Sequence, residues 1–355
     1  FTKYSYLVKN VDDIPRIVKE AFYIASTGRP GPVLIDLPKD VACSMTDYVD
    51  PGPVNIRSYK PTYVGHPGQI KRVVKAIGES KRPVICVGGG CITSNASSEI
   101  MELAERIKAP VASTLMGIGA FPSSHELYVG MLGQHGVYAA NQAIKEADLL
   151  IVLGARMGDR AVGKPDEFAH GAVIVHIDID PAEIGKNVGT NIPIVGDIKA
   201  TLQELLKKNI DRNDWGWLST IKKWKKLQQG VGECLNGLNP MEVLSELSAQ
   251  APKDGILVTD VGQHQIWAGR YYPIEQPRTF ISSGGLGTMG YGLPAAIGAK
   301  IGRPDKQVLL ITGDGSIQMN LAELATMVQE NAAVKILLFN NRSLGMVREL
   351  QQHQL

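Results

Sequence analysis

Short apolar runs alternate with amphipathic stretches along the middle of the chain. The apolar runs lie at 84–87, 111–113, 149–153, 173–179 and 192–195, and the stretches with helical spacing lie near 69–80, 96–107, 137–146 and 198–207. Runs of the first kind predict strands, and spacing of the second kind predicts helices with one apolar face. Their alternation predicts a parallel sheet covered by helices, which is an α/β unit with three layers.

Shorter patterns flank this unit. Residues 1–48 predict one helix, 11–26, and one strand, 33–37, which cannot bury both faces, so we expect them to belong to a domain whose remainder lies outside the chain. Beyond residue 239, helices are predicted at 240–249 and 291–301 and strands at 256–259 and 278–281. The predicted organisation is therefore 1–48, a proline-rich linker 49–68, a central domain 69–208, a second linker 209–238 and an incomplete domain 239–355.

Two strand-like runs near the end of the chain finish in polar side chains. The run 308–312 leads into Asp314, and the run 334–339 leads into Asn341, with a helical pattern between them. A strand–helix–strand crossover is right-handed and parallel, so both polar residues should emerge at the same edge of one sheet. A carboxylate, an amide oxygen and glycine-freed backbone suit a magnesium ion on a diphosphate.

The helix between these two runs has a recognisable start. Asn320 is followed three residues later by Glu323, just before an apolar pattern with helical spacing. This spacing predicts that the two side chains form a capping pair at the N-terminus of the helix.

Glycines and charged residues follow several strands of the central segment. The glycines free the backbone for close approach, the arginines provide positive charge for phosphate, and the aspartates offer carboxylates to ribose hydroxyls. Because loops after parallel strands share an edge, these groups should converge, which predicts nucleotide binding without specifying the nucleotide. The set is Gly88, Gly89, Gly90, Gly154, Arg156, Arg160, Asp178 and Asp197.

Composition narrows the classes of protein. The 355 residues are 44% hydrophobic and 20% charged with a net charge of +2, which gives no reason to expect nucleic acid or an anionic membrane as a partner. No apolar run is long enough to cross a bilayer. The four cysteines show neither zinc spacing nor a disulfide framework, so a reducing compartment is expected. The lysine- and tryptophan-rich stretch 215–226 predicts a solvated connecting helix.

Two further stretches make the pattern specific. Residues 28–36 read Gly-Arg-Pro-Gly-Pro-Val-Leu-Ile-Asp, and residues 283–294 read Ser-Gly-Gly-Leu-Gly-Thr-Met-Gly-Tyr-Gly-Leu-Pro. Together with the Asp314 and Asn341 segments, they resemble the catalytic subunit of acetohydroxyacid synthase (acetolactate synthase) along essentially the whole chain. The resemblance implies parallel-sheet, three-layer α/β domains of the thiamine-diphosphate enzyme type, with a central FAD-binding, Rossmann-like domain.

The resemblance also assigns contacts to each cofactor. Magnesium would be held by Asp314, by the side chain of Asn341 and by the backbone carbonyl of Ser343. Thiamine diphosphate would be contacted by Gly262, Gln263, His264, Gly287, Met289, Gly313, Gly315, Ser316, Gly345 and Met346. FAD would be contacted by Arg29, Gly88, Gly89, Thr114, Leu115, Leu132, Gly133, His135, Gly154, Arg156, Arg160, Asp178, Ile179 and Asp197.

Three residues are expected to act in catalysis on the strength of the same resemblance. Met289 would support the cofactor in its bent conformation, and Lys39 would line the substrate channel. Leu350 stands where many members carry a tryptophan that favours 2-oxobutyrate, which leaves the preferred second substrate open.

The activity implied is condensation of pyruvate with a second 2-oxo acid, pyruvate or 2-oxobutyrate. Carbon dioxide is lost, and acetolactate or acetohydroxybutyrate is formed for branched-chain amino-acid biosynthesis, with FAD in a structural role. A homodimer or tetramer, a regulatory small subunit, and a cytoplasmic location (a plastid in a plant) are also implied.

Two expectations limit this interpretation. The family's activating glutamate would precede Phe1, so we expect this chain by itself to be inactive. Pyruvate oxidase, glyoxylate carboligase and sulfoacetaldehyde acetyltransferase share these domains, and a nucleotide-binding module without catalysis is the alternative from another class.

Overall fold

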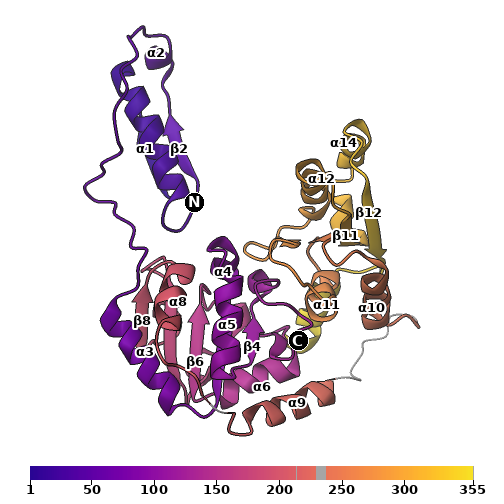
Figure 1. Cartoon of the computed structure of the whole chain (residues 1–355). Helices are drawn as coiled ribbons and strands as arrows, with labels where there is room; N and C mark the ends of the chain where they lie inside the picture. Colours follow the sequence, from indigo (N-terminus) through magenta and orange to yellow (C-terminus); the bar gives the residue numbers. More distant parts are fainter. Residues whose placement is uncertain (213, 229–236, 355) are drawn as a thin grey trace.

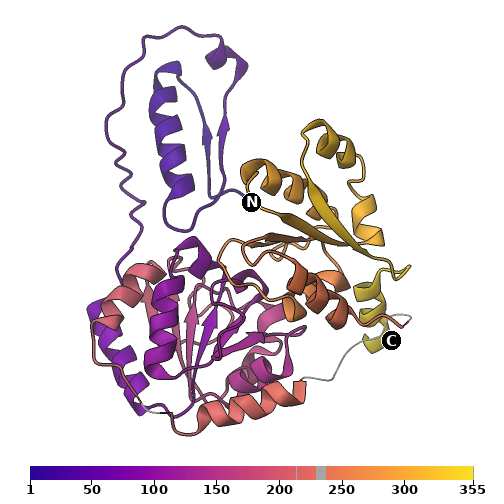
Figure 2. The same cartoon turned by 45° about the vertical axis from the view of Figure 1, so that its right-hand side comes forward.

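Three separate parallel sheets organise the chain. The computed structural model describes residues 1–212, 214–228 and 237–354, and the sheets of this part have two, six and four strands. In Figures 1 and 2 the two-stranded unit stands apart at the end of an extended segment, whereas the six- and four-stranded units lie side by side. The predicted α/β architecture with parallel sheets is therefore confirmed.

The N-terminal unit is a two-stranded sheet with one helix packed against it. β1 (Tyr4–Leu7) pairs in parallel with β2 (Val33–Asp36), and α1 (Ile14–Ser26) connects them. Ile17 of α1 packs with Val8 and Val41 in a small apolar cluster. The sequence predicts α1 and β2 but not β1, whose residues Tyr-Ser-Tyr-Leu lack the continuous apolar run Val-Leu-Ile of β2. Two short helices complete the unit: η1 (Val11–Asp13) and α2 (Lys39–Ala42).

The central sheet has the strand order β5-β4-β3-β6-β7-β8. The chain builds from β3 outward through β4 and β5, then returns to the other side of β3 to add β6, β7 and β8. This doubly wound order leaves a crevice beyond the carboxyl ends of β3 and β6, where the direction of winding reverses. The strands are β3 (Pro83–Val87), β4 (Val111–Ser113), β5 (Tyr128–Met131), β6 (Leu149–Leu153), β7 (Val173–Asp178) and β8 (Ile192–Val195).

Helices cover both faces of the central sheet. One apolar cluster joins the sheet to α3, α5 and α8, and a second joins its other face to α6 and α9. Five of these six strands match the predicted ranges to within a residue. The exception is β5, in which Gly130 has φ +102° and interrupts the apolar pattern. The helices are α3 (Pro67–Glu79), α4 (Gly89–Thr93), α5 (Ser97–Ile107), η2 (Leu115–Gly117), α6 (Tyr138–Glu146), α7 (Asp159–Val162), η3 (Pro165–Glu167), α8 (Ile198–Leu206) and α9 (Trp217–Gln228).

The tryptophan-rich stretch forms α9, which packs on the central unit. Trp217 is buried, its indole N–H donates to the carbonyl of Pro83 at 3.1 Å, and its ring meets that of Trp224 edge-on with centroids 5.5 Å apart. The predicted connecting helix is therefore confirmed, while positions 213 and 229–236 of the predicted second linker lie outside the described residues. Within the described ranges, no helix is both long and apolar enough to span a bilayer.

The C-terminal sheet has the strand order β10-β9-β11-β12. Its apolar core lies on both faces, where α10 and α11 pack on one side and α12 and α14 on the other. The elements are α10 (Pro240–Gln250), β9 (Ile256–Thr259), α11 (Gln263–Tyr271), β10 (Phe280–Ser282), α12 (Gly292–Gly302), β11 (Val308–Gly313), α13 (Asp314–Gln318), α14 (Glu323–Gln329), β12 (Val334–Phe339) and α15 (Gly345–Gln354).

The predicted capping pair before α14 is wrong. Ala322 occupies the N-cap position and makes no side-chain hydrogen bond there. The amide of Asn320 donates instead to the carbonyl of Gly290 at 2.8 Å, and the carboxylate of Glu323 accepts from the hydroxyl of Thr326. The Asn320 side chain therefore bonds to the distant carbonyl of Gly290 and does not cap α14.

Candidate functional site

The polar ends of β11 and β12 lie at one edge of the C-terminal sheet. The two strands are parallel neighbours, and the last pair in register is Gly313 opposite Phe339. Asp314 follows one residue beyond this pair and Asn341 two residues beyond it. Both residues therefore lie past the carboxyl edge, where an open parallel sheet binds ligands. Their role as metal ligands remains a prediction.

Asn341 is held by a short hydrogen-bond network. Its amide Nδ2 donates to Oε1 of Gln263 at 2.8 Å, and its Oδ1 accepts from the N–H of Ser343 at 3.0 Å. The Gln263 amide donates in turn to the carboxylate of Glu349 on α15. A Cβ on Gly345 would lie 1.8 Å from Oε1 of Gln263, so a glycine is required for α15 to begin this close.

His264 lies beneath the same edge, in space that two glycines leave open. A Cβ on Gly313 would lie 2.8 Å from its Nδ1, and a Cβ on Gly262 would lie 2.7 Å from its Cε1. The imidazole is 5% exposed, and this burial lowers the pKa of His264 to about 4. The ring is therefore neutral near pH 7, and its buried Nε2 has no hydrogen-bond partner in the described part of the chain.

Acid should destabilise the fold through His264. Its folded pKa of about 4 lies below the ordinary value of 6.5, so the unfolded chain takes up the proton first. The free energy of unfolding should therefore fall as the pH drops through 6.5 towards 4, by about 3 kcal/mol from this group. Urea unfolding at several pH values should show a weaker acid dependence for His264→Gln. The exposed His170→Gln is the matched control, and an unchanged dependence in His264→Gln would refute the assignment.

Met289 lies beside the turn that carries Asp314. A Cβ on Gly315 would lie 3.6 Å from Cε of Met289 and 2.9 Å from Cδ2 of Leu344. The hydroxyl of Ser316 donates to the carbonyl of Val261 at 2.6 Å, which ties the turn to the end of β9. The predicted aminopyrimidine loop thus lies next to the predicted diphosphate turn.

The polar groups at this edge fit a magnesium-bound diphosphate. Asp314 offers a carboxylate, Asn341 an amide oxygen and Ser343 a carbonyl, which are the hard oxygen ligands that magnesium takes. The hydroxyl of Ser343 and Nε2 of His264 are buried atoms without a partner in the described part of the chain. Buried polar atoms are normally hydrogen-bonded, and an oxygen-rich ligand at this edge would supply their partners.

A cleft of about 990 Å³ lies at the crevice between β3 and β6. Its walls come from the central unit, from the N-terminal unit and from the C-terminal loop 283–287, which packs against η2: a Cβ on Gly284 would lie 2.6 Å from Sδ of Met116. Twelve of the predicted FAD residues line the cleft: Arg29, Gly89, Thr114, Leu115, Leu132, His135, Gly154, Arg156, Arg160, Asp178, Ile179 and Asp197.

The two other predicted FAD residues lie behind the wall of the cleft. A Cβ on Gly88 would lie 2.2 Å from the carbonyl oxygen of Gly154, and a Cβ on Gly133 would lie 2.4 Å from that of Arg160. These glycines let neighbouring loops touch through their backbones. They shape the cleft without lining it.

Several charged groups around the cleft already have protein partners. Arg29 pairs with Glu183 at 2.7 Å and with Asp180 at 3.1 Å, which fastens the N-terminal unit to the central one. Asp197 caps α8 by accepting from the N–H of Ala200 and also accepts from the hydroxyl of Ser94. Burial raises the pKa of the Asp178 carboxyl.

Sequence reasoning missed several residues of the cleft wall. They include Met116, Met131 and Met157, because a methionine in an apolar stretch is expected in the core. Glu183 is another, since it belongs to no recognisable motif. The 283–287 loop carries a recognisable motif, but it is assigned to thiamine diphosphate alone. Its position on the cleft wall joins the two predicted cofactor sites.

Lys39 lies in a different unit from the rest of the site, whereas Leu350 follows Glu349, which accepts from Gln263. Lys39 begins α2, at the outer end of the N-terminal unit in Figure 1, and is exposed. Leu350 lies on α15 with 48% of its surface exposed. Within this one chain the two residues belong to different units.

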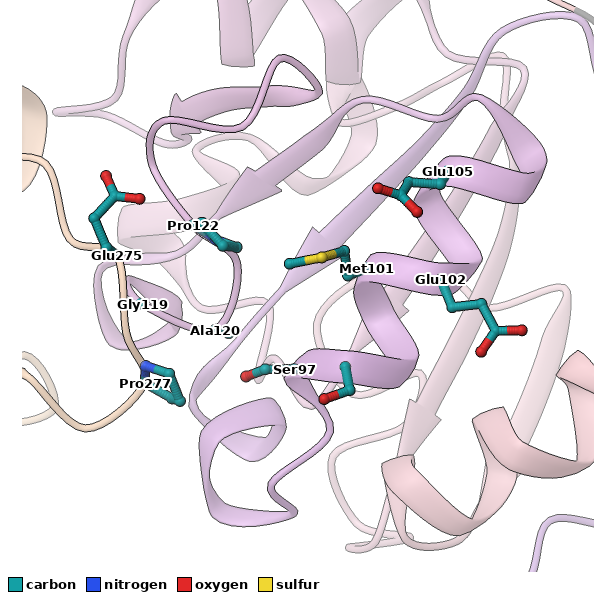
Figure 3. A pocket seen from close by; sticks show the side chains of 10 residues that line it. Ser97, Met101, Glu102, Glu105, Gly119, Ala120, Pro122, Glu275 and Pro277 are labelled. Atoms are coloured by element: carbon teal, nitrogen blue, oxygen red, sulfur yellow. The ribbon is translucent and has the colours of Figure 1, made fainter.

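A second hollow of about 340 Å³ lies between α5 and the 275–277 segment (Figure 3). Three of its lining residues are glutamates, but each has a partner: Glu105 is paired with His125, Glu102 with Arg106, and Glu275 accepts from the hydroxyl of Ser124. These carboxylates serve local structure, and we assign the hollow no role.

The fold and the site define a class of protein. Residues 70–205 match the model of the thiamine pyrophosphate enzyme central domain, and residues 260–355 match that of the C-terminal TPP binding domain. The chain belongs to the thiamine pyrophosphate enzymes.

The individual proteins that the chain is similar to include several acetolactate synthases. The chain is 48% identical to the acetolactate synthase large subunit of Buchnera aphidicola (subspecies Acyrthosiphon pisum), over 98% of this chain and 62% of that protein. It is 47% identical to that of Lactococcus lactis (99% and 61%) and 43% identical to the isozyme 3 large subunit of Escherichia coli K12 (98% and 62%). The resemblance is confirmed, and the chain spans about three fifths of the length of these relatives.

Proposed function

We propose that the protein condenses pyruvate with a second 2-oxo acid, with loss of carbon dioxide, to form acetolactate or acetohydroxybutyrate. The observation that carries the proposal is the shared carboxyl edge of β11 and β12: Asp314 and Asn341 follow the two strands there, and His264 lies beside Gly313. The similarity to acetolactate synthases supports the choice of this reaction among those of thiamine enzymes.

In this proposal the edge of the C-terminal sheet holds the diphosphate. Asp314, the Asn341 amide and the Ser343 carbonyl would bind magnesium, while Gly313 and Gly315 would let their backbone approach the diphosphate closely. His264, which fills the space beside Gly262 and Gly313, is neutral, so it would offer the diphosphate a ring nitrogen without adding charge to the site. Met289, next to the Gly315 turn, would support the ring end of the cofactor. The cofactor, when bound, supplies the electron sink for decarboxylation.

The central cleft is proposed to hold FAD in a Rossmann-like manner. Its position at the reversal of strand order is where doubly wound sheets bind dinucleotides, and its glycine-rich loops allow close approach to phosphate. Because the 283–287 loop forms part of the wall, a bound flavin would buttress the loop that carries Met289. A structural role for FAD follows from this placement.

The relatives are named large subunits, which supports an assembly with more than one chain. A homodimer or tetramer would bring the N-terminal unit of one copy to the C-terminal unit of another, and a smaller regulatory subunit is a proposed partner. The free thiols of Cys43, Cys86 and Cys91 fit a reducing compartment such as the cytoplasm.

Acetolactate formation from pyruvate tests the reaction. The natural full-length protein with magnesium, thiamine diphosphate and FAD should form acetolactate, and a chelator should reduce the rate to background until magnesium is restored. Anaerobic pyruvate should leave the flavin spectrum oxidised. Bleaching of the flavin without acetolactate would replace the proposal with a pyruvate oxidase, and tight flavin binding without any thiamine diphosphate binding would favour a non-catalytic module.

A further inference from the structure

The backbone of Gly290, next to Met289, is held by two side chains, one on each of the peptide groups that flank its Cα. Its N–H donates to Oδ1 of Asp260 at 2.9 Å, and its carbonyl accepts from Nδ2 of Asn320 at 2.8 Å. Asp260 and Asn320 each lie 30 residues from Gly290 along the chain, on opposite sides of it. Two distant segments therefore hold the backbone on either side of Gly290, the residue that follows Met289.

The clamp leaves no room for a side chain at Gly290. Its φ is +88°, and a Cβ there would lie 2.7 Å from Cβ of Met319 and 3.0 Å from Nδ2 of Asn320. Two residues on, a Cβ on Gly292 would lie 2.8 Å from Cβ of Asp260. The loop is therefore packed closely between the end of β9 and the segment after α13.

The hydrogen bonds of the Asp260 side chain go to backbone N–H groups of this loop and of Val261. This side chain is fully buried, and Oδ1 also accepts from the N–H of Val261 at 2.8 Å. Its Oδ2 is buried without a partner in the described part of the chain. Burying a carboxylate is costly unless it is paired, so a stability role alone is a poor explanation for an acid at this position. A carboxylate makes a stronger acceptor than an amide for the N–H of the loop.

The clamp joins Met289 to the turn that carries Asp314. Asn320 follows α13, the short helix that begins at Asp314, and Cε of Met289 lies near Gly315 of that helix, 3.6 Å from where a Cβ would stand. Gly290 and the turn proposed to bind the metal are therefore linked through Asn320. The geometry of this link sets the distance between the ring end and the diphosphate end of a bound cofactor.

We propose that Asp260 and Asn320 are positioning residues that fix Met289 relative to the diphosphate site. This proposal rests on the proposed thiamine-dependent function. Asp260 and Asn320 act on the cofactor only through Gly290 and Met289 and do not touch it themselves. Loosening the clamp should leave the diphosphate ligands in place but let Met289 drift. Substitution of Asp260 or Asn320 should therefore lower the reactivity of the bound cofactor much more than its affinity.

The first test needs no cofactor. Amide hydrogen exchange at Gly290, measured in the unliganded protein, should be faster by about 10-fold or more in Asp260→Ala and by about 5-fold in Asn320→Ala. Asp260→Asn keeps an oxygen at the Oδ1 position and should give a smaller increase than Asp260→Ala. Gln329→Ala, an exposed amide on α14, is the matched control. Unchanged exchange at Gly290 in Asn320→Ala would overturn the clamp.

The second test separates positioning from binding. In Asn320→Ala and Asn320→Asp variants of the natural full-length protein, the dissociation constant for magnesium–thiamine diphosphate should change by less than about threefold. The rate of deuterium exchange at C2 of the bound cofactor should fall by about 10- to 100-fold, because a small misplacement is felt at the reacting atom. Equal losses in both quantities, or an unchanged C2 rate with faster Gly290 exchange, would overturn the positioning role.

Failure of the proposed function would look different. If the unmodified protein binds no thiamine diphosphate, the function is wrong while the Gly290 exchange data still report on the clamp. If the Asp260 variants do not fold, as judged by thermal unfolding, the Asn320 variants decide the question, because Asn320 is exposed overall and carries no buried charge.

Discussion

Asp314→Ala is expected to lower the affinity for magnesium–thiamine diphosphate by about 100-fold or more, and acetolactate formation should fall at least as far. The reason is that Asp314 would provide the one carboxylate among the proposed metal ligands, whose other members are neutral amide and carbonyl oxygens. Even residues that only orient metal ligands typically change affinity by about 10- to 100-fold, so a ligand itself should reach the upper end. Titration of the natural protein with the cofactor, followed by its fluorescence or by calorimetry, measures the effect.

The matched control is Asp305→Ala. Asp305 is an exposed aspartate on the same unit that forms an ion pair with Arg303, so its loss should leave cofactor affinity unchanged. Asp314→Asn should fall between the two, since it keeps an oxygen but loses the charge. Wild-type affinity in Asp314→Ala would remove the metal assignment.

Gly88→Ala is expected to abolish flavin binding and to lower the free energy of unfolding by about 3 kcal/mol. The added Cβ would lie 2.2 Å from the carbonyl oxygen of Gly154 and 2.6 Å from Cα of Ala155. Both obstacles are backbone, so neither can rotate away as a side chain could. The loops after β3 and β6 would have to separate, and these loops form the floor of the cleft. Urea unfolding and the visible spectrum of the purified protein measure the two effects.

Gly78→Ala is the control for this substitution. Gly78 lies near the end of α3 with nothing within 4 Å of an added Cβ, so the change should be neutral or stabilise the protein by up to about 1 kcal/mol. Full flavin occupancy in Gly88→Ala would show that the cleft tolerates an opened floor, contrary to the proposed site.

Strands with continuous apolar runs are the ones that the sequence predicts. All five residues of β6 are buried, as are those of β3, so each reads as an apolar run bounded by polar residues or glycine. The sequence misses β1 and β5, whose runs are interrupted by Ser5 and by Gly130. Their pairing depends on a neighbouring strand that the local sequence does not contain.

Asn320 illustrates a different limit. Its spacing to Glu323 satisfies the rule for a capping pair, yet its amide turns to Gly290 because the loop brings an unpaired carbonyl within 2.8 Å. Local patterns compete with tertiary hydrogen bonds, and the sequence nearby does not reveal the competitor. Glu183 is a comparable case, since its pairing with Arg29 joins residues from two units.

The sequence by itself determined the alternation of strands and helices, the parallel sheets, and the placement of Asp314 and Asn341 after neighbouring strands. These features follow from local periodicity and from the handedness of the crossover, which any chain of this pattern obeys. Only the tertiary structure decided that the 283–287 loop closes the central cleft, that Gly88 shapes this cleft from behind, and that Asp260 and Asn320 grip Gly290. Such contacts join residues far apart in the chain, and close packing selects them after the elements have formed.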